Sequence, residues 1–134
     1  MNPHLALLQK LEQHPELLHS ETPGRLRIEP MAPNGFAVEL HGNGNKWAVH
    51  LGEAGFHEIF LSADEVLNFI SWCYSGDVRI RELWRGATPQ TAILEAVEDG
   101  EWREVSRTGN FFVPFWQQQR EVLLRNPNLL RNLT

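Results

Sequence analysis

Apolar and polar residues alternate along two neighbouring stretches of the chain, on either side of the loop 42–45. Alternation with a period of two is typical of a half-buried β-strand, and a loop of Gly and Asn tolerates the positive φ angles of a tight turn. A four-residue loop places residue 40 opposite 47, 38 opposite 49 and 36 opposite 51, so every facing pair is apolar. The pattern predicts a β-hairpin whose inward side chains are Phe36, Val38, Leu40, Trp47, Val49 and Leu51.

Shorter alternating segments before and after this hairpin predict more strands. Residues 25–29 place Leu26 and Ile28 on one side, and residues 56–61 continue the meander, which gives a first group of about four strands. About three further strands are predicted at 78–85, 91–97 and 101–107, with a strong hairpin turn at 99–100. Because short turns join consecutive strands, we expect the sheet to be antiparallel.

Helical spacing predicts a helix at the N-terminus and another in the centre of the chain. Residues 3–18 are rich in leucine at near-helical spacing, although Pro15 interrupts that helix or ends it early. Ser62, followed three residues later by Glu65, forms a capping box, so a second helix is expected from there to about residue 74.

A third helix is predicted from Pro114 to residue 126. Its residues follow i, i+3, i+4 spacing from a dense aromatic entry, and they are Phe112, Phe115, Trp116, Gln119, Val122 and Leu123. Strand groups separated by helices, without βαβ alternation, indicate an α+β fold. We therefore expect one α+β domain over 1–134, in which N-terminal, central and C-terminal helices pack on an antiparallel sheet. Residues 127–134 are expected to form a mobile or partner-bound tail.

In size, acidity and expected order of elements the chain resembles type III secretion effector chaperones. Those proteins are dimeric, so the resemblance implies self-association. It implies nothing about individual residues, because it is a likeness of fold and not of motif.

Composition and charge narrow the class of protein further. With 134 residues, 42% of them hydrophobic, and a net charge of −5, the chain is neither disordered nor a generally basic nucleic-acid binder. Residues 1–76 account for the whole acidic excess, whereas residues 108–134 carry a net charge of +2. The single cysteine, Cys73, allows no internal disulfide, and no signal peptide or membrane span is visible. We expect a cytoplasmic protein.

Histidines and glutamates gather on the polar side of the predicted hairpin and its neighbour strand. They point to a ligand, metal or acid/base face, because histidine is a common metal ligand and general base that a carboxylate can orient. A four-residue turn places His50 opposite His57, and a three-residue turn places it opposite Glu58 instead. The alternative is the solvated face of a half-buried sheet, which also looks polar. The residues of this face are Glu39, His41, His50, His57 and Glu58.

Arginines interleaved with tryptophans mark the second group of strands. Such a combination can bind an anion, but residues 77–107 hold five bases against seven acids, so cross-strand ion pairs are the alternative. A five-residue turn would place Arg81 opposite Glu95. The candidate anion-binding residues are Arg79, Arg81, Arg85, Arg103 and Arg107.

The surplus of leucine and aromatic residues on the terminal helices favours a third kind of surface, an interface with a protein partner or with a second copy. Its candidate residues are Leu7, Leu11, Leu18, Phe112, Phe115 and Trp116. No nucleotide-binding, nucleophile-elbow or zinc-cysteine motif is present, so no cofactor, metal or catalytic residue is assigned. The leading hypothesis is a non-catalytic, homo-oligomeric interaction module. The alternatives are an enzyme that uses the His/Glu face and a binder of anions through the arginines.

Overall fold

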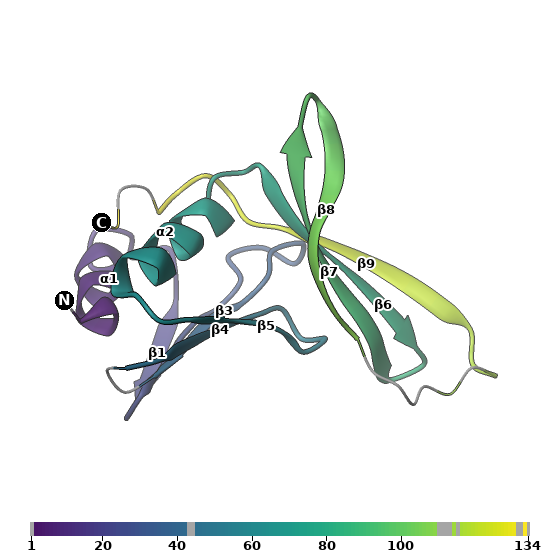
Figure 1. Cartoon of the computed structure of the whole chain (residues 1–134), viewed down its shortest axis with the longest axis horizontal. Coiled ribbons are helices and arrows are strands. Elements are labelled where there is room, and N and C mark those ends of the chain that lie inside the picture. Colours follow the sequence, from purple (N-terminus) through teal and green to yellow (C-terminus); the bar gives the residue numbers. More distant parts are fainter. Residues whose placement is uncertain (1, 43–44, 110–113, 115, 131–132, 134) are drawn as a thin grey trace.

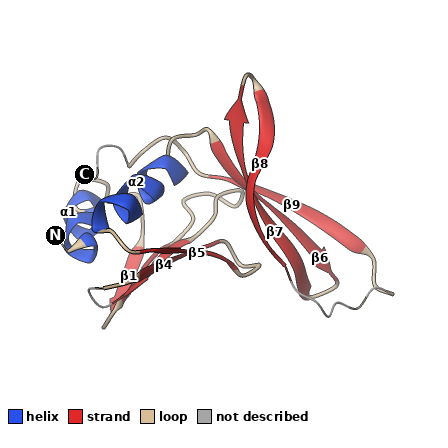
Figure 2. Cartoon of the chain, in the orientation of Figure 1, coloured by secondary structure: helices blue, strands red, loops and turns tan. Residues whose placement is uncertain are grey.

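The chain folds into two antiparallel sheets and two helices (Figures 1 and 2). The computed structural model describes residues 2–42, 45–109, 114, 116–130 and 133. Within that part there are nine strands. An α+β fold with antiparallel pairing is therefore confirmed. The expected single sheet covered by three helices is wrong.

The first sheet has five strands that follow one another in chain order. They are β1 (His19–Thr22), β2 (Arg25–Ile28), β3 (Val38–Gly42), β4 (Trp47–Leu51) and β5 (Phe56–Phe60). One face of this sheet is apolar and contributes Leu26, Leu40 and Val49 to the core. Helices α1 (Pro3–Leu11) and α2 (Ala63–Cys73) lie on that side (Figure 1). The opposite face carries no helix of the described chain.

The predicted hairpin at 36–51 forms, but its register is shifted by two residues. Val38 pairs with Leu51 and Leu40 with Val49, while Gly42 joins β3 and pairs with Trp47. A Cβ on Gly42 would collide with the Trp47 side chain, so glycine allows this closer pairing. A shift of two residues keeps every side chain on its own face. Alternation alone therefore does not distinguish the two registers.

The two helices start where the sequence indicates, and one ends earlier. Ser62 accepts a hydrogen bond from the backbone N–H of Glu65 and caps α2, as the capping box predicts. Helix α1 ends at Leu11 and not near residue 18, because the chain turns ahead of Pro15. The residues after that turn form β1, an unpredicted strand whose four side chains are all exposed.

The second sheet has four strands in the spatial order β8-β7-β6-β9. They are β6 (Val78–Arg85), β7 (Thr88–Glu98), β8 (Glu101–Gly109) and β9 (Gln119–Arg125). Asp99 and Gly100 both have positive φ, 53° and 77°, and they make the predicted hairpin turn between β7 and β8. Both ends of this sheet extend away from the helices and the first sheet (Figure 1).

The expected C-terminal helix is wrong, because residues 119–125 form the strand β9. This strand pairs with β6 along its length, and Leu124 lies opposite Ile80 with both side chains buried. Pairing with β6 satisfies the backbone hydrogen bonds that a lone helix would have to satisfy within itself. The order of elements on which the likeness to secretion chaperones rests therefore loses its last helix.

One hydrophobic core joins the two sheets. Ile80, Leu94 and Leu124 of the second sheet belong to the same buried cluster as the apolar face of the first. The chain after β9 returns to this core, where Leu130 is fully buried and its carbonyl accepts a hydrogen bond of 3.0 Å from the Ser71 hydroxyl of α2. This part of the expected tail at 127–134 thus packs on α2.

Candidate functional site

Alternation along the first sheet gathers polar side chains on the face opposite the core, which we call the polar face. The cross-strand row runs from Arg27 through Glu39 and His50 to His57, one residue from each of four strands. His41 lies on the same face, two residues along β3 from Glu39. Four of the five residues of the predicted His/Glu face are therefore brought together.

Glu58 is the exception, because it lies on the other face of the sheet. It pairs with Val49, a core residue, and its carboxylate accepts a hydrogen bond of 2.6 Å from the Ser106 hydroxyl of β8. The four-residue turn before β5 sets this arrangement: it places His50 opposite His57. Glu58 therefore connects the two sheets and cannot orient an imidazole of the polar face.

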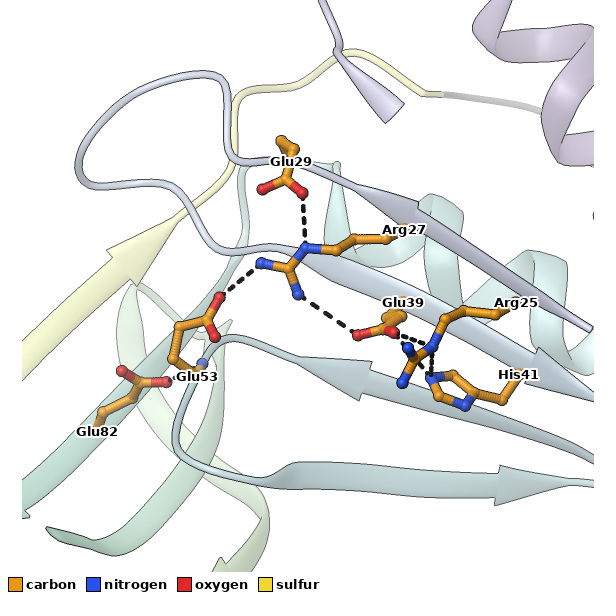
Figure 3. A network of polar contacts seen from close by, with 7 residues as sticks. All are labelled: Arg25, Arg27, Glu29, Glu39, His41, Glu53 and Glu82. Atoms are coloured by element: carbon orange, nitrogen blue, oxygen red, sulfur yellow. Dashed lines mark hydrogen bonds and ion pairs between the residues drawn. The ribbon is translucent and has the colours of Figure 1, made fainter. Parts of the chain in front are cut away.

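Two arginines hold the carboxylate of this face (Figure 3). Arg25 Nε lies 2.6 Å from Glu39 Oε1, and Arg27 Nη1 lies 3.4 Å from Glu39 Oε2. Arg27 also donates to Glu29 at 2.7 Å and to Glu53 at 2.8 Å, and these carboxylates raise its pKa. Glu39 Oε1 also lies 3.1 Å from His41 Nε2, so one carboxylate is shared between two guanidinium groups and an imidazole.

The three imidazoles of the polar face lie side by side and do not converge on one point. The ring centroids of His41 and His50 are 4.6 Å apart, and those of His50 and His57 are 5.6 Å apart in a stacked arrangement. Partial burial, followed by the neighbouring imidazoles, lowers the pKa of His50. Among the described residues, no group of three or more His, Cys, Asp or Glu side chains is arranged to hold a metal ion.

A shallow hollow of about 510 Å³ opens beside His41 and extends over Lys46, Ala48 and Ile59. His41 alone of the predicted His/Glu residues lines it. An active site needs several polar groups that converge on one reacting atom. This hollow offers an imidazole and a lysine at the edge of an otherwise apolar lining.

The second-sheet arginines mostly face carboxylates. Arg79 pairs with Glu95 at 2.7 Å, two residues from the predicted Arg81–Glu95 pairing, and Arg81 pairs with Glu121 at 3.0 Å. Arg103 pairs with Glu101 and Arg107 with Glu104, whereas Arg85 donates to Gln90 and to the Gln117 carbonyl. Trp102 lies under Arg79, whose guanidinium carbon is 4.4 Å from the ring centroid. Four of the five candidate arginines thus have an acidic neighbour within the chain.

The predicted interface residues divide into buried and exposed sets. Leu7 and Leu11 are in the core, whereas Leu18 and Trp116 are exposed. Phe112 and Phe115 lie outside the described residues. In this fold Leu7 and Leu11 stabilise the core, whereas Leu5 on the same helix is 54% exposed.

Sequence reasoning missed the outer face of the second sheet, meaning the side turned away from the first sheet. Register places Leu83 of β6, Ile93 and Val97 of β7, and Leu123 of β9 on this side. Their strand neighbours on the other side, such as Leu94 and Leu124, are buried. Leu123 is 44% exposed and Val97 39% exposed, whereas Ile93 is only 3% exposed, and neither helix of the described chain packs there. Once Leu123 is placed on a strand, the alternation of 119–125 reveals this face.

Comparisons with known proteins give no further guide to this site. No family model, no curated protein and no solved structure matches the chain. Neither helix of the described chain is long and apolar enough to cross a membrane.

Proposed function

We propose that this protein is a non-catalytic interaction module that binds a protein partner through the outer face of its second sheet. One observation carries the proposal: neither helix of the described chain packs on this face of the four-stranded sheet, where Leu123 and Val97 are exposed. Domains are built from packed layers, since a sheet with apolar residues on a face gains stability by burying them. A partner would supply the missing layer.

The side chains of this face suit a reversible interface. Leu123 and Val97 are exposed, and Val105, the extra residue of a bulge in β8, is 55% exposed. Arg79 and Trp102 lie beside them, and arginine and aromatic residues are enriched at interfaces. The Arg81–Glu121 ion pair lies among these side chains, since Arg81 stands in the same cross-strand row as Leu123.

A photo-crosslinking amino acid at position 123 tests this proposal in living cells. We expect light-dependent adducts with protein from position 123 and also from position 97. The matched control is position 9, an exposed residue on α1 that is far from the second sheet along the chain. Absence of protein adducts from both test positions, or equal adducts from position 9, would contradict the proposed function.

A further inference from the structure

A hollow of about 360 Å³ lies where three separate parts of the chain meet. The loop after β2 contributes Met31, Ala32 and Asn34, the turn after α2 contributes Gly76, and the end of β9 and the chain beyond it contribute residues 125–128. None of them belongs to the polar face or to the site residues predicted from the sequence. Ligand sites in proteins enclose about 300–1,000 Å³, so this hollow has room for a small ligand.

Arg125 gives this hollow a positive charge that no carboxylate of the described chain neutralises. Its Nε donates a hydrogen bond of 2.6 Å to the Gly76 carbonyl, and its guanidinium carbon lies 5.2 Å from the Trp102 ring centroid. These two contacts hold the guanidinium in place and leave its two terminal nitrogens for another acceptor. Within the described residues no ion pair includes Arg125, whereas its cross-strand neighbour Arg79 pairs with Glu95. An anion from outside the chain can therefore pair with Arg125 without displacing an internal carboxylate.

Asn126 adds a second donor, and it alone is buried among the residues that line the hollow. The residue is 2% exposed, and its Oδ1 accepts a hydrogen bond of 2.9 Å from the Phe36 backbone N–H. Its Nδ2 has no hydrogen-bond partner within the described chain. Nearly all buried polar groups of native proteins have a partner, so this donor indicates an acceptor from outside the chain, either water or a ligand. The charge of Arg125 at the same hollow favours a ligand.

We propose that this hollow binds a carboxylate that ends a small apolar molecule or a peptide chain. The terminal nitrogens of Arg125 match the two oxygens of a carboxylate, and Asn126 Nδ2 donates to a second acceptor of the ligand, further into the hollow. Met31, Ala32 and Pro127 give the lining an apolar part for the body of the ligand. With one positive charge, the hollow suits a carboxylate better than a phosphate group, whose charge approaches about −2.

Ligand entry requires a small rearrangement, because Asn126 Nδ2 is buried before the ligand arrives. Asn34 and Asn128 are exposed residues of the same lining, and movement of their side chains gives access to this donor. Rotamer changes of this kind are common when proteins bind their partners. The inference is independent of the proposed function, since it needs no protein on the outer face of the second sheet.

Titration of the full chain, followed by two-dimensional nitrogen–proton NMR, tests the site, because the side-chain NH₂ group of Asn126 has signals of its own. The probes are N-acetylleucine and a tetra-alanine peptide that ends in leucine with a free carboxylate. Each has a matched control in which a carboxamide replaces that carboxylate. We expect the acids to shift the signals of Asn126 and Gly76 with a Kd of about 1 mM or below, and the amides to bind at least about tenfold more weakly.

The two acids also identify the source of the carboxylate. A peptide that binds at least about tenfold more tightly than N-acetylleucine identifies a chain end as the ligand, because contacts beyond the last residue then contribute. Otherwise the ligand is a free acid. Both results support a carboxylate site.

Two variants assign the donors. Arg125→Gln removes the charge, and Asn126→Asp removes the Nδ2 donor while it keeps an oxygen for the Phe36 N–H. Each should weaken the binding of N-acetylleucine at least about tenfold. Arg120→Gln changes an exposed arginine of the same strand that does not line the hollow, so this matched control should bind within about twofold of wild type. Circular dichroism checks the fold of each variant, and the comparison of acid with amide needs no variant.

Three results would overturn the inference: no saturable shift with either acid, amides that bind as the acids do, or an Arg125→Gln variant that binds as wild type does. A hollow that holds only water gives the first of these results. None of the three bears on the crosslinking from positions 97 and 123, which tests the proposed function separately.

Discussion

Glu82 is a carboxylate that the fold buries at the boundary between its two sheets. It is 3% exposed, and its Oε2 accepts hydrogen bonds from the backbone N–H groups of Glu53 and Ala54 at 2.9 and 3.0 Å. The Trp84 indole donates to Oε1 at 3.3 Å. One side chain of β6 thus accepts hydrogen bonds from two backbone N–H groups of the turn between β4 and β5. Its partners are 28 and 29 residues away in the sequence, so no local pattern identifies this role.

Replacing Glu82 by Ala should lower the free energy of unfolding by about 2–3 kcal/mol, because a buried backbone N–H then loses its acceptor. Urea denaturation followed by circular dichroism measures the change. Glu53→Ala is the matched control: its exposed carboxylate pairs with Arg27, and such surface pairs contribute less than about 1 kcal/mol. Equal losses in the two variants would contradict the role given to Glu82.

His50 makes stability depend on pH. Partial burial is the largest cause of its lowered pKa, the imidazoles of His41 and His57 add to the effect, and Glu39 opposes it. The unfolded chain therefore binds a proton at a higher pH than the folded chain does. The contribution of His50 to the stability of the fold is fully present above about pH 6.5, the ordinary pKa of histidine. It is lost as the pH falls through the pKa that His50 has in the folded protein.

We expect the urea midpoint to fall between about pH 7 and pH 5, and His50→Gln to reduce that fall. Burial also lowers the pKa of His4, so part of the dependence should remain. His19→Gln, at an exposed position of β1, is the matched control and should leave the slope as in wild type. A slope in His50→Gln equal to that of wild type would count against this assignment.

Among the elements, the turn between β4 and β5 offers two glycines with similar backbone conformations and different surroundings. Gly52 has φ of +69° and Gly55 has φ of +88°. A Cβ on Gly52 would come within 2.5 Å of Glu82 Oε2, whereas a Cβ on Gly55 would meet nothing within 4 Å. The two positions separate backbone strain from steric conflict.

Gly55→Ala should cost about 1 kcal/mol of stability, the penalty of a left-handed conformation for alanine. Gly52→Ala carries the same penalty and also displaces the Glu82 carboxylate, so it should cost at least about 2 kcal/mol more. Thermal or urea unfolding of both variants gives the comparison. Equal costs would show that the carboxylate moves aside freely.

The elements also show which parts of the fold the sequence predicts and which it does not. Strands with clear alternation, such as β2 and β4, are predictable, and so is α2 through its capping box. Residues 119–125 satisfy a helical period as well, because Leu123 and Leu124 are both apolar and hide the alternation. Pairing with β6 favours the strand over the helix, because the second edge of β6 needs a partner. That partner lies about 40 residues further along the chain. Likewise, β1 contains no apolar residue on either of its faces, so it shows no alternation that would predict a strand.

At the scale of the whole molecule, the candidate sites differ in how much of each could be predicted from the sequence. The polar face could be assembled from alternation and turn length, except for the side on which Glu58 lies. The outer face could not, because it exists only after β9 is placed beside β6.

The pairing of β9 with β6 also has a consequence for the order in which the molecule forms. The other pairings of the second sheet are hairpins with turns of two residues, which close on a microsecond timescale. The strand β9 must return across a much longer loop, and the Asn126 side chain must reach Phe36, 90 residues away. Until then, β6 has a free edge and Ile80 lacks its neighbour Leu124. We therefore infer a late closing step, during which newly made chains are most prone to aggregate through that edge.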